Sequence, residues 1–118
     1  MEYSWIEKYC SEKQGAILEY KQEWQATKCM VGNKMFALQG KDKTDRPIIT
    51  LKLLPEDGYF LREQYEDITA GYYMNKEHWN SVYLDGSVES EIIKDMIDKS
   101  YQLIFDALPK KTKKEILG

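Results

Sequence analysis

The chain has 118 residues, and its 17 Lys and Arg against 20 Asp and Glu give a net charge of −3 at pH 7. Its content of 42% hydrophobic and 13% aromatic residues is typical of globular proteins and excludes a disordered, collagen-like or disulfide-rich chain. This length predicts a single domain over residues 1–118. No apolar run is long enough for a membrane helix, and the first residues lack the basic charge of a secretory signal, so we expect a cytoplasmic protein without membrane contact.

The first predicted element is a helix over about residues 5–14. Ser4 and Glu7 have the spacing of a capping box, in which each side chain satisfies a free amide at the start of a helix. Cys10 falls on the apolar side of this helix, and we expect both cysteines to be reduced thiols. The next stretch, residues 16–23, is predicted to be irregular.

Three antiparallel strands are predicted next. Residues 24–31 and 34–39 flank Gly32-Asn33, a pair that tolerates positive φ and is typical of a tight hairpin turn. The third strand covers 47–53 and has the clearest alternation of the chain. On one of its faces, which we expect to pack against helices, lie Ile49, Leu51 and Leu53.

A second helix is predicted to begin at Pro55, which is well suited to a first helical turn. Its apolar stripe is expected to contain Phe60, Leu61 and Tyr65. Residues 67–75 are predicted to be irregular or an edge strand, and 78–84 to be a further strand.

The longest predicted helix covers about residues 89–108, and Pro109 ends it. We expect Ser100 to allow close approach of this helix, with its hydroxyl bonded to the carbonyl of Met96. The tail that follows carries Lys110, Lys111, Lys113 and Lys114. We interpret these lysines as a solvated helix end.

This order of elements predicts an α+β fold, with helices packed on one face of an antiparallel sheet. The other face mixes apolar and polar residues in the strands 34–39 and 78–84. Two interpretations stay open for it: it is an interaction surface, or loops or a second copy of the chain cover it.

The sequence holds little material for catalysis or metal binding. With one histidine and two cysteines 19 positions apart, no zinc motif can be written. There is no GxSxG elbow for a serine nucleophile and no glycine-rich phosphate loop. We therefore predict no catalytic residues, no metal and no cofactor, and we expect a protein that is not an enzyme.

Several motifs occur in an order that resembles the MmcQ/YjbR family over nearly the whole chain. They are Gly32 to Leu38, Leu51-Lys52 before Pro55-Glu56, Ile68 to Val82, Asp98 to Tyr101 and Leu108 to Lys111. The most specific of them is Gly71-Tyr72-Tyr73-Met74-Asn75-Lys76-Glu77-His78-Trp79-Asn80-Ser81-Val82. The family usually has Thr-Pro-Gly-Tyr-His where this chain has Thr69 to Tyr73.

The resemblance implies a CyaY-like topology, similar in outline to frataxin: helix, three strands, helix, one or more strands and a long C-terminal helix. It also implies a "double-wing" DNA-binding activity, which for the family is inferred from structure. It does not imply an enzyme.

Two groups of residues are candidates for contact with DNA. A basic hairpin loop supplies cations for phosphates, and a later segment combines amides, a cation and an indole that can stack on a base. These residues are Lys34, Lys41, Lys43 and Arg46, and then Asn75, Lys76, His78, Trp79 and Asn80. We favour Trp79 as a core anchor, and Asn75 is also interpretable as a turn cap. His78 and Trp79 should face opposite ways.

The alternative is a module that binds a protein or small-molecule ligand over an aromatic sheet face, with no nucleic-acid contact. The residues that would form this face are Tyr72, Tyr73, His78 and Trp79. The sequence leaves the oligomeric state open.

Overall fold

A computed structural model describes residues 4–71 and 75–118 of the chain. Its elements in chain order are α1 (Trp5–Ser11), β1 (Ala16–Lys21), β2 (Ala26–Val31), β3 (Lys34–Lys41), β4 (Pro47–Lys52), α2 (Pro55–Gln64), β5 (Ile68–Ala70), β6 (Trp79–Tyr83), α3 (Ser90–Asp106) and α4 (Lys110–Leu117). This is the predicted α+β order, and the predicted helix 5–14 is shorter than expected.

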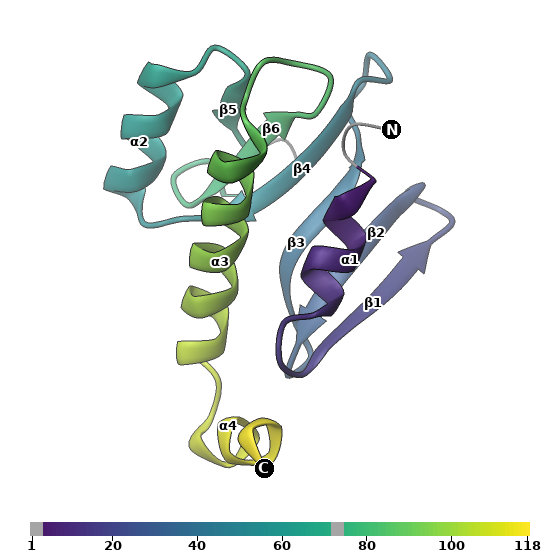
Figure 1. The fold of residues 1–118 in the computed structure, drawn as a ribbon, viewed down its shortest axis with the longest axis vertical. Helices are drawn as coiled ribbons and strands as arrows, with labels where there is room; N and C mark the ends of the chain where they lie inside the picture. Colours follow the sequence, from purple (N-terminus) through teal and green to yellow (C-terminus); the bar gives the residue numbers. More distant parts are fainter. Residues whose placement is uncertain (1–3, 72–74) are drawn as a thin grey trace.

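The strands form one antiparallel sheet in the order β1-β2-β3-β4-β6-β5. Helix α3 packs on β3 and β4, and α1 packs on β1. Figure 1 shows both helices on the same side of the sheet, with α2 beside β5 and α4 beyond the end of the strands. The helix-covered face is therefore the core side, as the sequence predicted.

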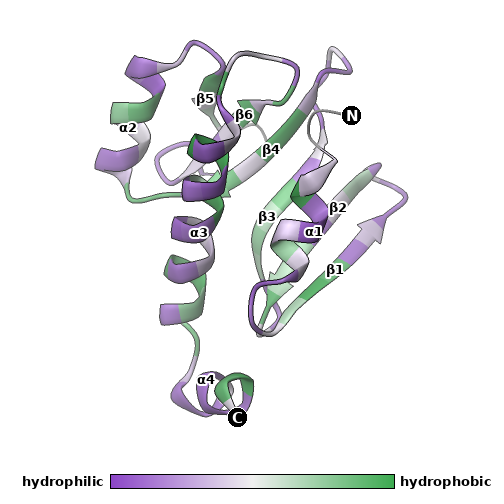
Figure 2. Cartoon of the chain, viewed as in Figure 1, coloured by the Kyte–Doolittle hydropathy of each residue, from purple (hydrophilic) through white to green (hydrophobic). Residues whose placement is uncertain are grey.

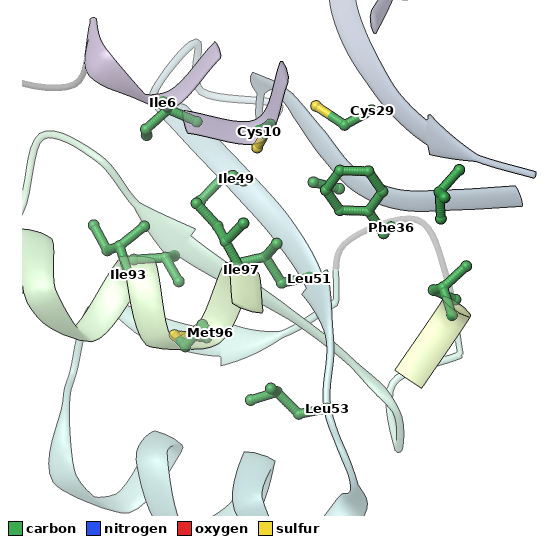
Figure 3. Close-up of a cluster of buried hydrophobic side chains, with 14 of the residues drawn as sticks. Ile6, Cys10, Cys29, Phe36, Ile49, Leu51, Leu53, Ile93, Met96 and Ile97 are labelled. Carbon is green, nitrogen blue, oxygen red and sulfur yellow. The ribbon is translucent and has the colours of Figure 1, made fainter. Parts of the chain in front are cut away.

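The hydrophobic core lies between this face of the sheet and the two helices. Figure 3 shows Ile6 and Cys10 from α1 and Ile97 from α3 converging on sheet residues such as Phe36, and all four are fully buried. Figure 2 shows hydrophilic residues on the side of α3 turned away from the sheet. The predicted inward face of β4 is confirmed, because its members are buried: Ile49, Leu51 and Leu53.

The predicted hairpin turn between β2 and β3 is also confirmed. Gly32 and Asn33 both have positive φ, of 55° and 65°. A Cβ at Gly32 would lie 2.7 Å from Leu108 and 3.0 Å from Thr112, so the turn packs closely against the chain where α3 gives way to α4. Glycine at this position therefore satisfies both the backbone conformation and the close approach.

The prediction that residues 16–23 are irregular is wrong, because this stretch contains β1. Six residues pair with β2, from Ala16 opposite Val31 to Lys21 opposite Ala26. Its inward residue Leu18 packs on the core, whereas Ile17 is exposed on the other face. A strand at the sheet edge with an exposed apolar residue lacks the clean alternation that sequence analysis requires.

The capping box predicted at Ser4 does not form. Ser4 is the N-cap residue of α1, but it has helical φ and ψ and makes no side-chain cap hydrogen bond. Helix α1 ends at Ser11, and its C-cap is Glu12.

The apolar stripe predicted for α2 is correct in part. Leu61 and Tyr65 pack against the core, but Phe60 is 62% exposed. The helix approaches the sheet through Gly58, which is buried, and this rotates Phe60 outward.

The tail predicted to be a solvated helix end instead forms a separate helix, α4. Its Ile116 packs against the core and lies next to Gly15, while Leu117 is exposed. Pro109 separates α3 from α4, as predicted for the end of the long helix.

None of the helices in residues 4–71 and 75–118 combines the length and the apolar character needed to cross a membrane.

Candidate functional site

The second face of the sheet carries residues at alternate positions of the strands. Leu38 lies opposite both Lys28 and Thr50, and Ile17 lies opposite Met30. In the described part of the chain, α1 and α3 both pack on the other face, so these residues are not covered by either helix. We call this the helix-free face.

A groove with a volume of about 680 Å³ follows this face along β2 and β3. Its lining, which defines the sheet groove, is Glu23, Trp24, Ala26, Lys28, Met30, Asn33, Lys34, Met35, Leu38, Gly40, Lys41, Ile48 and Thr50. The floor is apolar, since Ala26, Leu38 and Ile48 are buried. Ligand sites are commonly concave and apolar with a few polar groups at their margin, and the sheet groove has this character.

Two small neighbouring residues help to form the hollow. Ala26 at the start of β2 lies against Gly40 of β3, and a Cβ at Gly40 would lie 2.9 Å from the Ala26 Cβ. Both residues line the groove, so larger side chains here would fill part of it.

Trp24 stands at one end of the sheet groove, in the turn between β1 and β2. Its side chain is 56% exposed, which is unusual for the largest apolar residue type. The Lys28 Nζ lies 5.5 Å from the centre of the Trp24 ring, within the range of a cation–π contact. The indole therefore offers a flat surface with a cation beside it.

The charged residues of the sheet groove are mainly basic. Lys28, Lys34 and Lys41 line it together with one acid, Glu23, for a net charge of +2. Lys34 is exposed and makes no ion pair with any residue of 4–71 or 75–118. Lys41 lies 3.6 Å from the Asp45 carboxylate in an exposed pair, which contributes little and is open to competition.

Arg46, a predicted contact of the hairpin loop, is already engaged within the protein. Its guanidinium donates to Asp85 at 2.8 Å, lies 3.8 Å from Asp67 and stacks 3.7 Å from the centre of the Tyr83 ring. The hydrogen bond from Arg46 lowers the pKa of Asp85 below its usual value. Arg46 therefore links the start of β4 to the end of β6.

The β3–β4 turn, in which Lys43 was predicted as a DNA contact, is held by Asp42. Its Oδ1 accepts hydrogen bonds from the Thr44 N–H, the Thr44 hydroxyl and the Arg46 N–H. The bond from the Thr44 side chain is the main cause that lowers the pKa of Asp42. Lys43 is exposed and makes no ion pair with a described residue.

The segment from Asn75 to Asn80 lies at the other end of the sheet. The pair Lys41–Pro47 marks the hairpin end of β4, whereas Lys52 at its far end pairs with Trp79. These ends are about 17 Å apart along the strand. The structure therefore does not bring the two predicted groups of site residues together.

The side chains of this segment have different roles. Asn75 Oδ1 accepts a hydrogen bond of 2.9 Å from the Glu77 N–H, which is the turn-capping role that the sequence left open. Lys76 is exposed and His78 is half-buried. Trp79 is half-buried on the helix-free face, in register with Lys52.

Asn80 is not available to read a base edge, which corrects its place among the predicted contacts. It is 0% exposed on the helix side of β6, where its amide bonds to Arg62 and to the His78 carbonyl. The predicted contacts Tyr72 and Tyr73 lie outside the described residues.

In residues 4–71 and 75–118, no three His, Cys, Asp or Glu side chains come together as a metal-binding group.

Several residues of the sheet groove were not predicted as site residues from the sequence. Trp24 and Lys28 were placed in a strand without a role, and Met30 and Met35 were not considered. The signal that identifies them is the alternation Ala26, Lys28, Met30 along β2, which places the three side chains on one face beside Trp24.

The fold and the sheet groove define a small α+β protein with an open, basic-rimmed sheet face. The sequence model of the YjbR family matches residues 11–103. The chain is 37% identical over 114 residues to the uncharacterized protein YjbR of Escherichia coli K12, covering 97% of this chain and 96% of the relative. It is also 34% identical to the uncharacterized protein YbdF of Escherichia coli O157:H7 over 73% of this chain and 70% of that one. This chain belongs to the YjbR family.

Solved structures have the same architecture. The crystal structure of the DUF419-domain protein DR2400 from Deinococcus radiodurans aligns with a TM-score of 0.83 at 28% identity, over 94% of this chain and 84% of that one. A crystal structure from Pseudomonas syringae aligns with a TM-score of 0.77 at 26% identity, over 87% of this chain and 98% of that one.

Proposed function

We propose that this chain is a non-enzymatic nucleic-acid-binding protein that holds an unpaired strand across the sheet groove. The observation that carries the proposal is the combination, in one concave surface, of an exposed indole, an apolar floor and three lysines. Proteins that bind single strands combine these same features, since bases stack on aromatic rings and phosphates meet cations.

The geometry favours an unpaired strand over a duplex. A duplex keeps its bases stacked inside and presents mainly phosphates and the polar edges of its base pairs. The apolar floor of the sheet groove makes no favourable contact with either. An extended strand can place a base on Trp24 and run along β3, where Lys34 and Lys41 are about 23 Å apart.

The predicted hairpin route to DNA has less support. Of its cations, Arg46 is engaged by Asp85, and Lys34 and Lys41 line the sheet groove as well. This leaves Lys43 as the cation specific to the hairpin that is exposed and has no ion pair among the described residues. Binding by a double-wing mode would therefore depend on Lys43, and this separates the two routes experimentally.

The alternative function is that the chain binds a protein or a small molecule in the groove and makes no contact with nucleic acid. The apolar floor with Met30 and Met35 favours it, because flexible methionines adapt to varied partners. The lysines favour an anionic polymer instead, and an anionic polymer shows a salt dependence that an apolar ligand does not.

The test is the fluorescence anisotropy of a labelled single strand of about 12 nucleotides at about 50 and 200 mM salt. For three phosphate contacts, the logarithm of the binding constant should fall with the logarithm of the salt concentration with a slope near −2. The affinity should therefore be about 20-fold lower at the higher salt. The variant Lys28→Glu with Lys34→Glu should abolish most of this binding, and Trp24→Ala should weaken it about tenfold through lost stacking.

The matched control is Lys8→Glu with Lys99→Glu, which makes the same change of charge on the helix side of the molecule. This control should bind within about twofold of the unmodified chain, because Lys8 and Lys99 lie on α1 and α3 and neither of them lines the groove. Binding that falls with Lys43→Glu but not with the groove variant would overturn the proposal in favour of the hairpin. No binding to any strand at low salt would overturn nucleic-acid binding altogether.

A further inference from the structure

Helix α4 lies at the end of the sheet that carries the β2–β3 turn. A Cβ at Gly32 would lie 3.0 Å from the Thr112 side chain, so the first turn of α4 contacts the β2–β3 turn. The Gln14 side chain donates to the Ile116 carbonyl at 3.2 Å, which fixes the last turn of α4 beside the start of β1. Figure 1 shows α4 just beyond the β2–β3 turn. The next residues of that turn and strand, Asn33 and Lys34, line the sheet groove.

The exposed side of α4 carries three lysines. At about 100° per residue, Lys110, Lys111 and Lys114 fall within an arc of about 100°, whereas the half-buried Thr112 and Ile116 lie on the opposite side. None of the three lysines makes an ion pair with a residue in the described part of the chain. By contrast, Lys13, Lys94 and Lys99 elsewhere are paired with carboxylates.

The position of Lys110 and Lys111 does not serve the stability of the helix. They lie in its first turn, which holds no acidic residue, and a cation at this end opposes the helix dipole. The N-cap is Pro109 and offers no side-chain cap. These lysines therefore place positive charge on the exposed side of α4 at a cost to the stability of the helix.

We propose that α4 is a second contact surface for the nucleic acid in the sheet groove, with a bound strand passing Lys34 and continuing onto Lys110 and Lys111. This inference rests on the proposed function and extends it: the chain should prefer strands longer than the sheet groove itself. Short strands use Lys28, Lys34 and Lys41 alone, and longer ones gain further phosphate contacts on α4.

The experiment compares labelled single strands of about 5 and about 15 nucleotides on the unmodified chain and on the variant Lys110→Glu with Lys111→Glu. Acidic residues in the first turn favour a helix, so this variant keeps α4, and circular dichroism checks that it does. We expect the variant to bind the short strand within about twofold of the unmodified chain. For the long strand we expect the variant to bind about tenfold or more weakly at about 50 mM salt. The slope of log affinity against log salt concentration should become shallower by about 1.4, which corresponds to two lost phosphate contacts.

The charge-matched control, Lys8→Glu with Lys99→Glu, should leave both strands unaffected. An unchanged affinity of the α4 variant for the long strand, while the unmodified chain binds both strands, would overturn this inference and leave the proposed function intact. An equal loss on the short and long strands would also overturn it, because it would be a general effect of charge. If the unmodified chain binds neither strand, the proposed function and this inference both fail.

Discussion

At the scale of single residues, Ser100 connects the long helix to the sheet. Its hydroxyl donates to the Phe36 carbonyl at 2.6 Å and accepts from the Lys52 N–H at 2.8 Å. The sequence predicted a hydrogen bond to Met96 on the same helix, and this is wrong. The contact between α3 and the sheet is close enough for the hydroxyl to reach two strands, and their free backbone groups compete for it successfully.

We expect Ser100→Ala to lower the free energy of unfolding by about 2 kcal/mol, because it leaves a buried carbonyl and a backbone amide without their partner. Urea unfolding followed by circular dichroism measures this change. Ser90→Ala, at the exposed start of α3, is the control and should stay within about 0.5 kcal/mol. A loss for Ser100→Ala no larger than that of the control would show that water or another group replaces the hydroxyl.

At the scale of elements, α2 depends on a close approach between Gly58 and Asn80. A Cβ at Gly58 would lie 2.8 Å from Asn80 Oδ1, and the same oxygen accepts a hydrogen bond from Arg62. Asn80 is fully buried, so it has little room to shift. A glycine inside a helix ordinarily weakens it, whereas in this structure Gly58 is what lets α2 pack closely against Asn80.

Gly58→Ala should therefore destabilise the protein by about 1 kcal/mol, although the same change in an exposed helix stabilises by a similar amount. Denaturant unfolding of Gly58→Ala, Asn80→Ala and the double variant tests whether contact with Asn80 causes the loss of stability. With Asn80 shortened, Gly58→Ala should become neutral or stabilising, which gives a coupling energy of about 1 kcal/mol or more. Additive effects in this cycle would contradict the proposed contact.

The elements that sequence analysis found are those in which local pattern and packing agree. In β4, alternation alone identifies Ile49, Leu51 and Leu53 as the inward face, and their burial confirms it. β1 was not predicted because Ile17 and Tyr20, on opposite faces of this edge strand, are both exposed. Its formation therefore depends on pairing with β2. α4 was not predicted because lysines occupy its first turn and because its packing depends on Gly15, which is distant in the sequence.

The candidate site was predictable only where it follows one strand. Lys34 and Lys41 belong to β3 and were identified, but the hollow between them depends on the register that brings Ala26 beside Gly40. The engagement of Arg46 by Asp85 joins residues 39 positions apart, which no local pattern indicates. The sequence shows which residues are cations and so could contact a ligand. Whether a cation is free to do so depends on its partners in the tertiary structure.

At the scale of the whole molecule, the net charge of −3 conceals an uneven distribution. Carboxylates pair with Lys13, Lys94 and Lys99 around the helices, while the lysines of the sheet groove other than Lys41 and those on the exposed side of α4 make no ion pair within the described residues. An acidic protein can therefore present a basic path, since local potential rather than total charge governs the approach of a polyanion.

The burial of ionisable groups in the core makes the stability of the whole molecule sensitive to alkaline pH. The side-chain contact with Cys29 and burial raise the pKa of the Cys10 thiol, and burial with a hydrogen bond to Asp98 raises the pKa of Tyr9 to about 12. In the unfolded chain a thiol titrates near pH 8.5 and a tyrosine near 10. Above these values the unfolded chain loses protons that the native protein keeps, so rising pH favours unfolding.

We expect the free energy of unfolding to fall by about 1.4 kcal/mol per pH unit between about pH 8.5 and 10 through Cys10, and more steeply above pH 10 as Tyr9 contributes. Urea unfolding at pH 7, 9 and 10 measures this slope. Cys10→Ala should lower stability at pH 7 through the small cavity it leaves, yet flatten the slope below pH 10, and Tyr9→Phe should remove part of the decline above pH 10. A slope that Cys10→Ala leaves unchanged would show that other groups carry the alkaline sensitivity, and that α1 opens in the native protein far enough for the thiol to titrate.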